Sequence, residues 1–393
     1  MAAPLIADLP IGLRLPIVVV EIALGIAVGP HGLGVARAEG VLGFLGLLGL
    51  TFLFFLAGLE IDFRRIRGRP LLLASAGWLC SFALALLIAG WLWRVGFVRA
   101  PLLVAVALAT TALGTLLPIL RDAGELETRF GQFVLATGAL GEVGPIVAVS
   151  VILTGEHTRW SQTGLLLAFI AVAAAAMGTA LRVHPPDVVR LFARTMHASS
   201  QLPVRVCVLL LIGLVVLADS FGLDVILGAF AAGLIVGLAR ADAEAGDVLQ
   251  HKLEAIGFGF LVPIFFVTSG IRFDVAALAH GPATWVRLGV FLVLFLAVRG
   301  IPALLYRRDV EPANLVPLAL YASTTLPLIV AITEVGVATG RMRSDNAAAL
   351  VGAGMLSVLI FPLAALAWRR RDLLDSRRSA QRASREERRR AKH

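Results

Sequence analysis

This sequence has few residues that could carry redox chemistry or hold a transition metal. Only two of its 393 residues are cysteines, Cys80 and Cys207, and both lie in apolar runs without a partner at metal-ligand spacing. The seven histidines are scattered, and no phosphate-binding loop, zinc-protease motif or nucleophile elbow is present. We therefore expect no cofactor, no catalytic residues and no metabolic enzyme, and we interpret both cysteines as small core residues.

Charged residues are also scarce. They make up 16% of the chain, whereas 59% is hydrophobic and the mean hydropathy is +0.89. A globular core could not bury this much apolar surface, so we expect the chain to cross a bilayer. The formal net charge of +9 lies largely in short loops and in the tail after Trp368. We interpret the tail as a solvated cytoplasmic segment that faces anionic lipid, and we expect no nucleic acid partner.

Long apolar runs predict an all-α polytopic membrane protein with about twelve transmembrane helices. The first run carries Glu21 and belongs to a repeat, so we expect no cleavable signal peptide. The helices are expected near residues 14–29, 42–60, 70–93, 100–120, 131–153, 163–182, 203–220, 222–239, 254–271, 284–306, 313–338 and 346–368.

Arginines between these runs predict the orientation, because basic residues concentrate in cytoplasmic loops. The basic loops follow the second, sixth and tenth runs and contain Arg64, Arg65, Arg67, Arg69, Arg182, Arg190, Arg194, Arg205, Arg307 and Arg308. Arg341 and Arg343 run against this trend. We expect a multi-pass protein of the plasma membrane with a cytoplasmic C-terminus.

Three short patterns occur twice in the same order. They are Ala23-x-Gly25-x-x-Val28-Gly29 and Ala231-x-Gly233-x-x-Val236-Gly237, Phe54-Phe55 before Gly58 and Phe265-Phe266 before Gly270, and Ala109-Thr110-Thr111 and Ala322-Ser323-Thr324. The copies begin an odd number of helices apart, so we expect inverted repeats, which are typical of alternating-access transporters, although a channel could also be duplicated. The predicted units are residues 14–153 and 222–368 as the two five-helix repeats, 163–220 as a linker pair of helices, and 369–393 as the basic tail.

Two apolar segments contain residues that weaken a helix at corresponding places. The first has Thr110-Thr111 before Gly114 and Pro118, and the second has Ser323-Thr324-Thr325 before Pro327. Interrupted helices at matching positions of two halves indicate a transporter site, whereas a pair of simple proline kinks is the alternative. If the helices are broken, Thr110, Thr111, Thr324 and Thr325 are expected to supply hydroxyl or nearby backbone ligands.

Glu142 lies near the middle of the fifth apolar run. A carboxylate there is costly and usually marks an ion or proton site, so we expect a monovalent cation and a proton to compete for its oxygens. The alternative is a structural carboxylic acid that stays protonated. Arg299, between Leu292 and Leu305, needs a counter-charge and is expected near Glu142 in at least one state, unless it snorkels to the interface.

Two other acidic residues are weaker candidates. Glu21 could form an ion-entry gate or act as a second acid, although a packing role is equally compatible with the sequence. Glu334 follows the second break and is a candidate for the outward pathway, as a gate or as a second acid.

In this order the motifs resemble the monovalent cation:proton antiporter-2 family, which includes Kef-type potassium exchangers and bacterial sodium/proton exchangers. The carrying segments are Gly25 to Gly34, Leu50 to Asp62, Thr110 to Thr128, Gly228 to Gly237 and Pro263 to Gly270. The resemblance implies a sodium/proton antiporter fold, in which a core of crossed broken helices moves against a dimerisation domain and a carboxylate exchanges cation and proton. It also implies a homodimer.

The chain departs from the pattern of that family at three places. Gly141 and Glu142 occupy the two positions of the family's acidic pair, so a single carboxylate favours electroneutral one-for-one exchange. Arg299 lies where relatives often have a lysine and is expected to be a fixed charge partner. Thr324-Thr325-Leu326-Pro327 replaces an Arg-Gly-Glu sequence found in many relatives, so the family's ion selectivity does not transfer directly.

The sequence therefore predicts a proton-coupled secondary antiporter for Na⁺ or K⁺ that serves pH homeostasis. An ion-coupled carrier of an organic solute with the same fold is one alternative, because related folds move organic anions. A membrane sensor or scaffold that kept the fold without transport is the other.

Overall fold

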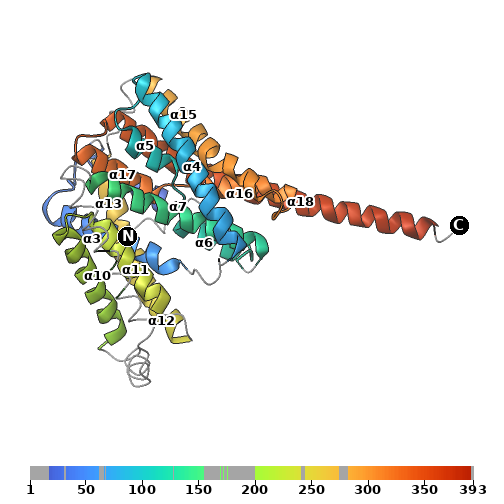
Figure 1. Ribbon diagram of the computed structural model, residues 1–393, viewed down its shortest axis with the longest axis horizontal. Coiled ribbons are helices and arrows are strands. Elements are labelled where there is room, and N and C mark those ends of the chain that lie inside the picture. Colours follow the sequence, from blue (N-terminus) through green and yellow to red (C-terminus); the bar gives the residue numbers. More distant parts are fainter. Residues whose placement is uncertain are drawn as a thin grey trace.

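The computed structural model describes residues 17–390, except 31, 62–65, 67, 127, 155–199 apart from 169, 171 and 175, 240–243 and 274–281. All regular secondary structure in these ranges is helical, and α18 projects far from the body of the molecule (Figure 1). The longer α-helices are α3 (Gly40–Glu60), α4 (Arg69–Arg94), α7 (Arg129–Thr154), α10 (Leu202–Ser220), α15 (Pro282–Gly300) and α18 (Ser344–Arg390). The shorter ones are α2 (Ile17–Val28), α5 (Pro101–Leu108), α6 (Leu113–Asp122), α11 (Val225–Ala239), α12 (Glu244–Ile256), α13 (Val262–Arg272), α16 (Pro312–Ala322) and α17 (Pro327–Ala338). A π-helical segment η1 (Gly257–Leu261) joins α12 to α13, and a 3₁₀ segment η2 (Ile301–Tyr306) follows α15.

The prediction of an all-α membrane protein is confirmed. Among the described residues, eight helical stretches are long and apolar enough to cross a membrane, and three shorter apolar helices accompany them. Every predicted run has a helical counterpart except 163–182, which lies almost wholly outside the described residues. The loop arginines Arg64, Arg65, Arg67, Arg182, Arg190 and Arg194 also lie outside them.

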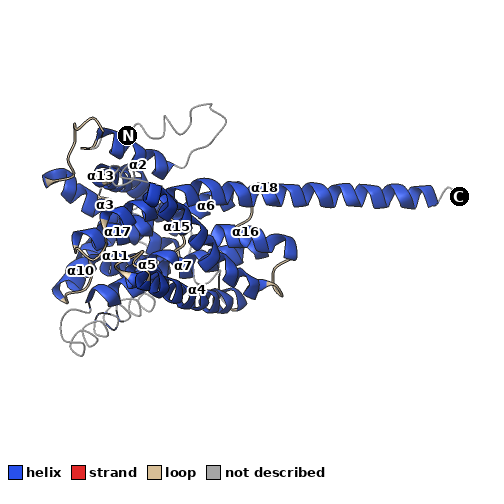
Figure 2. Ribbon diagram, turned by 90° about the horizontal axis from the view of Figure 1, so that it is seen from above, coloured by secondary structure: helices blue, strands red, loops and turns tan. Residues whose placement is uncertain are grey.

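Helix packing separates the described helices into two groups. The first group contains α2, α3 and α10–α13, and the second contains α4–α7 and α15–α18. The main contacts between the groups are those of α11 with α7 and of α3 with α6. Views from two directions agree that α10 and α11 lie on a different side of the molecule from α4 and α16 (Figures 1 and 2). We call these the α3 group and the α7 group.

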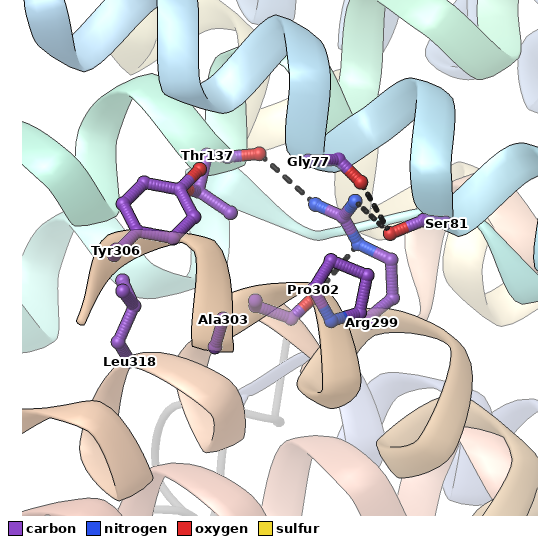
Figure 3. Close-up of a pocket in the computed structure, with 9 residues that line it drawn as sticks. Gly77, Ser81, Thr137, Arg299, Pro302, Ala303, Tyr306 and Leu318 are labelled. Atoms are coloured by element: carbon purple, nitrogen blue, oxygen red, sulfur yellow. Dashed lines mark hydrogen bonds between the residues drawn. The ribbon is translucent and has the colours of Figure 1, made fainter.

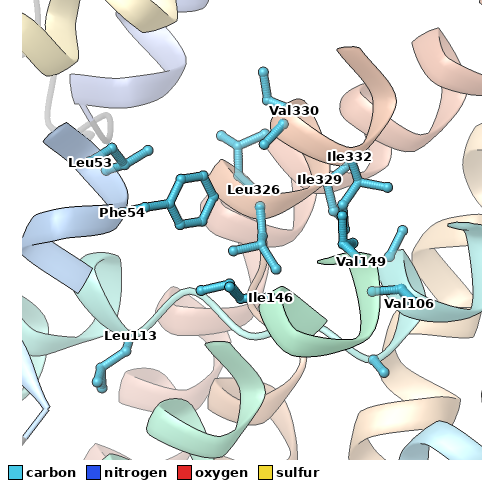
Figure 4. Packing of buried hydrophobic residues seen from close by; sticks show 14 of the residues in the cluster. Leu53, Phe54, Val106, Leu113, Ile146, Val149, Leu326, Ile329, Val330 and Ile332 are labelled. Carbon is cyan, nitrogen blue, oxygen red and sulfur yellow. The ribbon is translucent and has the colours of Figure 1, made fainter. Parts of the chain in front are cut away.

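Buried apolar side chains line the boundary between the two groups. Phe54 of α3 points toward Leu326, which directly precedes α17, and toward Ile146 of α7, and all three are at most 2% exposed (Figure 4). Such side chains pack without directional hydrogen bonds. The boundary is therefore held largely by apolar contact.

Glycines of the repeated patterns allow two close helix crossings inside the α3 group. A Cβ on Gly25 of α2 would lie 2.2 Å from the carbonyl oxygen of Val267 on α13. A Cβ on Gly233 of α11 would lie 1.9 Å from the carbonyl oxygen of Phe55 on α3. Gly25 and Gly233 are equivalent in the repeat, so the first helix of each copy packs on the second helix of the other. This exchange supports the inverted-repeat interpretation, which stays a prediction.

The two cysteines have different surroundings. Cys207 is buried, as expected of a core residue, but Cys80 on α4 is exposed. The expectation that Cys80 is a core residue is wrong. The buried face of α4 contains Gly77 and Ser81, and Cys80 lies outside that face.

Candidate functional site

Both predicted interruptions are present, and they meet. Helix α5 ends at Leu108 before α6, and α16 ends at Ala322 before α17, so the helices are broken and not merely kinked. The backbone N–H of Ala112 donates to the carbonyl oxygen of Thr324 over 2.8 Å. The hydroxyls of Thr110 and Thr325 lie 2.5 Å apart. The two non-helical segments therefore cross within the α7 group.

Threonine hydroxyls at the crossing bind backbone carbonyls near the breaks. Thr110 donates to Ala107 over 2.7 Å, and Thr324 donates to Leu320 over 3.0 Å. Thr111 donates across the crossing to Ala322. Polar side chains commonly bond such carbonyls where a helix breaks inside a membrane. In this structure these hydroxyls thus support the breaks.

Two further side chains that the sequence reasoning missed hold the breaks in place. Ser357 on α18 accepts from the backbone N–H of Thr325, and its oxygen lies 2.7 Å from the Thr325 carbonyl oxygen. The indole N–H of Trp78 on α4 donates to the carbonyl oxygen of Ala109 over 3.2 Å. Ser357 is a polar residue in an apolar stretch, and that was the available signal for it.

Glu142 lies beside the start of α6. Its Oε1 accepts from the backbone N–H of Leu113 over 2.8 Å, and Leu113 is the first residue of that helix. A helix N-terminus favours a carboxylate because its amides and dipole point toward it. The side chain is only 7% exposed, and its buried Oε2 has no hydrogen-bond partner among the described residues. One carboxylate oxygen is thus fixed, and the other is available to a proton or a cation.

Position 141, the first position of the acidic pair, has no space for a side chain. A Cβ on Gly141 would lie 2.5 Å from the Thr111 hydroxyl and 2.9 Å from a terminal nitrogen of Arg299. One turn further along α7, a Cβ on Gly144 would lie 2.2 Å from the ring of Trp78. The close approach of the first break to α7 therefore requires glycine at position 141.

Arg299 is buried against neutral oxygens. Its guanidinium donates to the Thr111 hydroxyl over 2.8 and 3.0 Å, to the Ser81 hydroxyl over 3.2 Å and to the Thr137 carbonyl oxygen over 3.1 Å. Figure 3 shows it pointing between Ser81 and Thr137. It is 3% exposed, so it does not snorkel. No ion pair of Arg299 with Glu142, both of which the structure describes, is formed, so that contact stays a prediction for another state.

A small cavity lies beside the guanidinium. Its lining includes Thr137, Arg299, Pro302 and Tyr306, and the Thr137 and Tyr306 hydroxyls are hydrogen-bonded at 2.9 Å (Figure 3). The segment η2 forms one wall of the cavity. Movement of η2 would therefore change the surroundings of the Arg299 guanidinium directly.

The remaining acidic candidates lie elsewhere. Glu334 forms an ion pair with Arg272 at the end of α13, so this pair joins the α7 group to the α3 group. Glu21 is buried on α2, which packs against α13, and it has no hydrogen bond or ion pair with Glu142 or the site threonines, all of which are described. The structure also places Glu60 near the site, because a Cβ on Gly114 of α6 would lie 3.5 Å from its Oε2. Glu60 ends α3, and a helix end gave no reason to select it.

Comparison with known proteins gives consistent results. Residues 3–366 match the family model described as sodium/hydrogen exchanger, transmembrane. An Na⁺/H⁺ antiporter of Enterococcus hirae is 24% identical over 359 residues, which cover 89% of this chain and 90% of that protein. Cation/H⁺ antiporter 17 of Arabidopsis thaliana is 32% identical over 73% of this chain and 37% of its own length. YjbQ of Bacillus subtilis (strain 168), provisionally named an Na⁺/H⁺ antiporter, is 28% identical over 89% of this chain, which spans 58% of YjbQ.

Among solved structures, the sodium/proton antiporter MjNhaP1 of Methanocaldococcus jannaschii at pH 8 has a TM-score of 0.59. It is 15% identical, and the match covers 93% of this chain and 92% of that one. The two proteins share the fold. With the family match over nearly the whole sequence, the chain belongs to the transmembrane sodium/hydrogen exchanger family.

Proposed function

We propose that this chain exchanges Na⁺ or K⁺ for H⁺ as a proton-coupled secondary antiporter. The observation that carries the proposal is the position of Glu142 at the crossing of the broken helices. One of its oxygens is held by the N-terminus of α6, and the other has no hydrogen-bond partner within the described part of the chain. The names of the relatives support the same class of transport.

A single carboxylate can couple the two ions by competition. A proton and a monovalent cation both neutralise Glu142, and both need its free oxygen, so binding of one excludes the other. The hydroxyls of Thr110, Thr111 and Thr324 already bind carbonyl oxygens. A hydroxyl that donates to a carbonyl keeps lone pairs that can bind a cation. We therefore assign the other cation ligands to the threonine hydroxyls at the crossing or to nearby backbone oxygens, and Glu142 supplies the charge.

Alternating access requires the site to face each side in turn. The α7 group carries both broken helices, Glu142 and Arg299, whereas the α3 group meets it across a largely apolar boundary. Sliding of the α7 group against the α3 group would carry the site across the membrane. In this proposal the α3 group is the fixed body, and a homodimer forms through it.

Arg299 and Gly141 support a one-for-one cycle. Arginine does not readily release its proton, and no second acid fits at position 141 in this structure. Glu142 would then be the only group that changes charge at the crossing. We propose electroneutral exchange on this basis.

The topology of the protein is also part of the proposal. The ion pair of Arg69 with Asp309 places the start of α4 and the segment after η2 at one end of the molecule. Arg307 and Arg308 are at that end too, and such basic loops favour the cytoplasm. We infer a plasma-membrane protein with a cytoplasmic C-terminus and a role in pH homeostasis.

The experiment is cation-induced proton movement in proteoliposomes, followed with a pH-sensitive dye. Wild-type protein should respond to Na⁺ or K⁺, and Glu142→Gln should not, because the amide keeps the shape and loses the charge. Glu39→Gln is the matched control, since Glu39 is an exposed carboxylate before α3 without a capping bond. No response of the wild type to either cation would leave an organic solute carrier or a sensor as the better account.

A further inference from the structure

A groove on the outer surface of the α7 group combines an apolar floor with a basic rim. It lies between α4 and η2 and has a volume of about 610 Å³. The floor is formed by Leu73, Cys80, Ile301, Leu304 and Leu305. Ile301 is 53% exposed and Leu304 is 61% exposed. Apolar side chains exposed on the outer surface of a membrane-spanning helix face the hydrocarbon of the bilayer.

Arginines surround one end of this groove. Arg69, Arg307 and Arg308 line it together with Asp309. Asp309 is paired with Arg69 and lies 3.7 Å from Arg129. The hydrogen bond from Arg69 holds the pKa of Asp309 below its usual range, so this carboxylate is ionised near neutral pH. The groove is thus lined by three arginines and one carboxylate, and the rim keeps an excess of positive charge.

The position of the groove matches an amphiphilic anion. The basic rim is at the end of the molecule that we assign to the cytoplasm, and the inner leaflet is the anionic one. The apolar floor continues from that rim along α4 and η2 toward the membrane interior. A free phosphate would contact the arginines of the rim but not the apolar floor. A neutral lipid would contact the apolar floor but would gain little binding energy from the arginines.

We propose that this groove binds an anionic phospholipid of the cytoplasmic leaflet. Its phosphate contacts Arg307 and Arg308, and one acyl chain lies over Leu304 and Cys80. The site is separate from the Glu142 site, and binding there does not depend on the exchange proposed above.

The bound lipid would touch elements that also form the Arg299 cavity. Pro302 lines both the groove and that cavity. On α4, Cys80 faces the groove, and its neighbour Ser81 accepts from Arg299. A lipid in the groove therefore supports the outer side of the wall that holds Arg299, and we expect it to stabilise that arrangement.

The first test measures binding by the delipidated protein in detergent, using native mass spectrometry and thermal unfolding. Phosphatidylglycerol should bind and raise the melting temperature more than phosphatidylcholine. Each arginine near an anionic membrane surface contributes roughly fivefold in affinity, so Arg307→Gln with Arg308→Gln should weaken phosphatidylglycerol binding about 30-fold. Arg94→Gln, an exposed arginine at the opposite end of α4, is the matched control and should change binding little.

The second test maps the acyl chain. In a Cys207→Ser background, Cys80 is the single thiol, and its alkylation by N-ethylmaleimide should be slowed by phosphatidylglycerol but not by glycerol phosphate or inorganic phosphate. Equal protection by phosphatidylcholine would show a non-selective lipid layer and overturn the proposal. Equal stabilisation by inorganic phosphate would show a soluble-anion site and overturn it as well. Protection that depends on protein concentration without lipid would assign the groove to a second copy of the chain.

Discussion

At the scale of single residues, Gly141 limits the number of carboxylates at the crossing. The volume that a side chain at position 141 would need is filled by Thr111 and by the guanidinium of Arg299. Both of these contribute to the crossing of the broken helices. The absence of a second acid from the pair is therefore built into the packing.

A methyl group at position 141 tests this packing. Gly141→Ala should lower the free energy of unfolding by about 1–3 kcal/mol, because overpacking forces neighbouring groups to shift. The control is Gly213→Ala on α10, where an added Cβ meets no atom within 4 Å. Thermal unfolding in detergent gives the comparison. Equal melting temperatures for the two variants would show that position 141 has space for a side chain.

The sequence contained the residues that matter most at this scale. Glu142 and Arg299 stand out because each is a lone charge in an apolar run. The proximity of Glu60 to α6 could not be predicted, since it depends on how α3 meets the other group. The neutral partners of Arg299 could not be predicted either. Every residue has a backbone carbonyl, so the sequence does not show that the carbonyl of Thr137 is the one that accepts.

At the scale of elements, the interrupted helices were predictable because their breaks have a chemical cause. Proline at position 327 removes an amide donor, and glycine at position 114 adds backbone freedom, so both segments weaken at matching places. Ser357 is visible in the sequence as a polar residue in an apolar stretch, but its contact with the second break was not predictable. It requires the third helix α18 to pass beside the second break, and a single serine gives no periodic signal.

Removal of the Ser357 hydroxyl tests the support of the second break. Ser357→Ala leaves the buried backbone N–H of Thr325 without its partner, which should cost about 1–3 kcal/mol of stability. It should also slow exchange. Ser75→Ala is the matched control, because the Ser75 hydroxyl bonds only the Leu71 carbonyl oxygen four residues before it in the same helix. If both variants had the same melting temperature and exchanged ions at the wild-type rate, Ser357 would have no role at the break.

At the scale of the whole molecule, the sequence contained the repeat but did not specify which helices of its two copies cross. Gly25 and Gly233 occupy equivalent places in the repeated pattern, and the structure shows that each allows a close helix crossing. The pairing of Arg272 with Glu334 joins residues of the two groups, and nothing local in the sequence specifies it. Such long-range pairs depend on the relative position of the groups, which changes in an alternating-access cycle.

The Arg272 to Glu334 pair should therefore affect conformation more than stability. Its side chains are 44% and 24% exposed, so Arg272→Gln should change the free energy of unfolding by less than about 1 kcal/mol. The same variant should change the apparent cation affinity by up to about fivefold, because loss of the ion pair changes the relative free energies of the conformations in the transport cycle. Arg37→Gln, an exposed loop arginine, is the control. Unchanged affinity with Arg272→Gln would show that the pair does not bias the transport cycle.

The central claim is that one carboxylate, Glu142, exchanges one proton for one monovalent cation. It is tested most directly by recording the pH-dye response and the solid-supported-membrane current from the same proteoliposomes. We predict cation-dependent proton movement without a sustained current, and loss of that movement in Glu142→Gln. A sustained current that follows exchange and disappears in Glu142→Gln would contradict the claim and direct attention to a second titrating group such as Glu60.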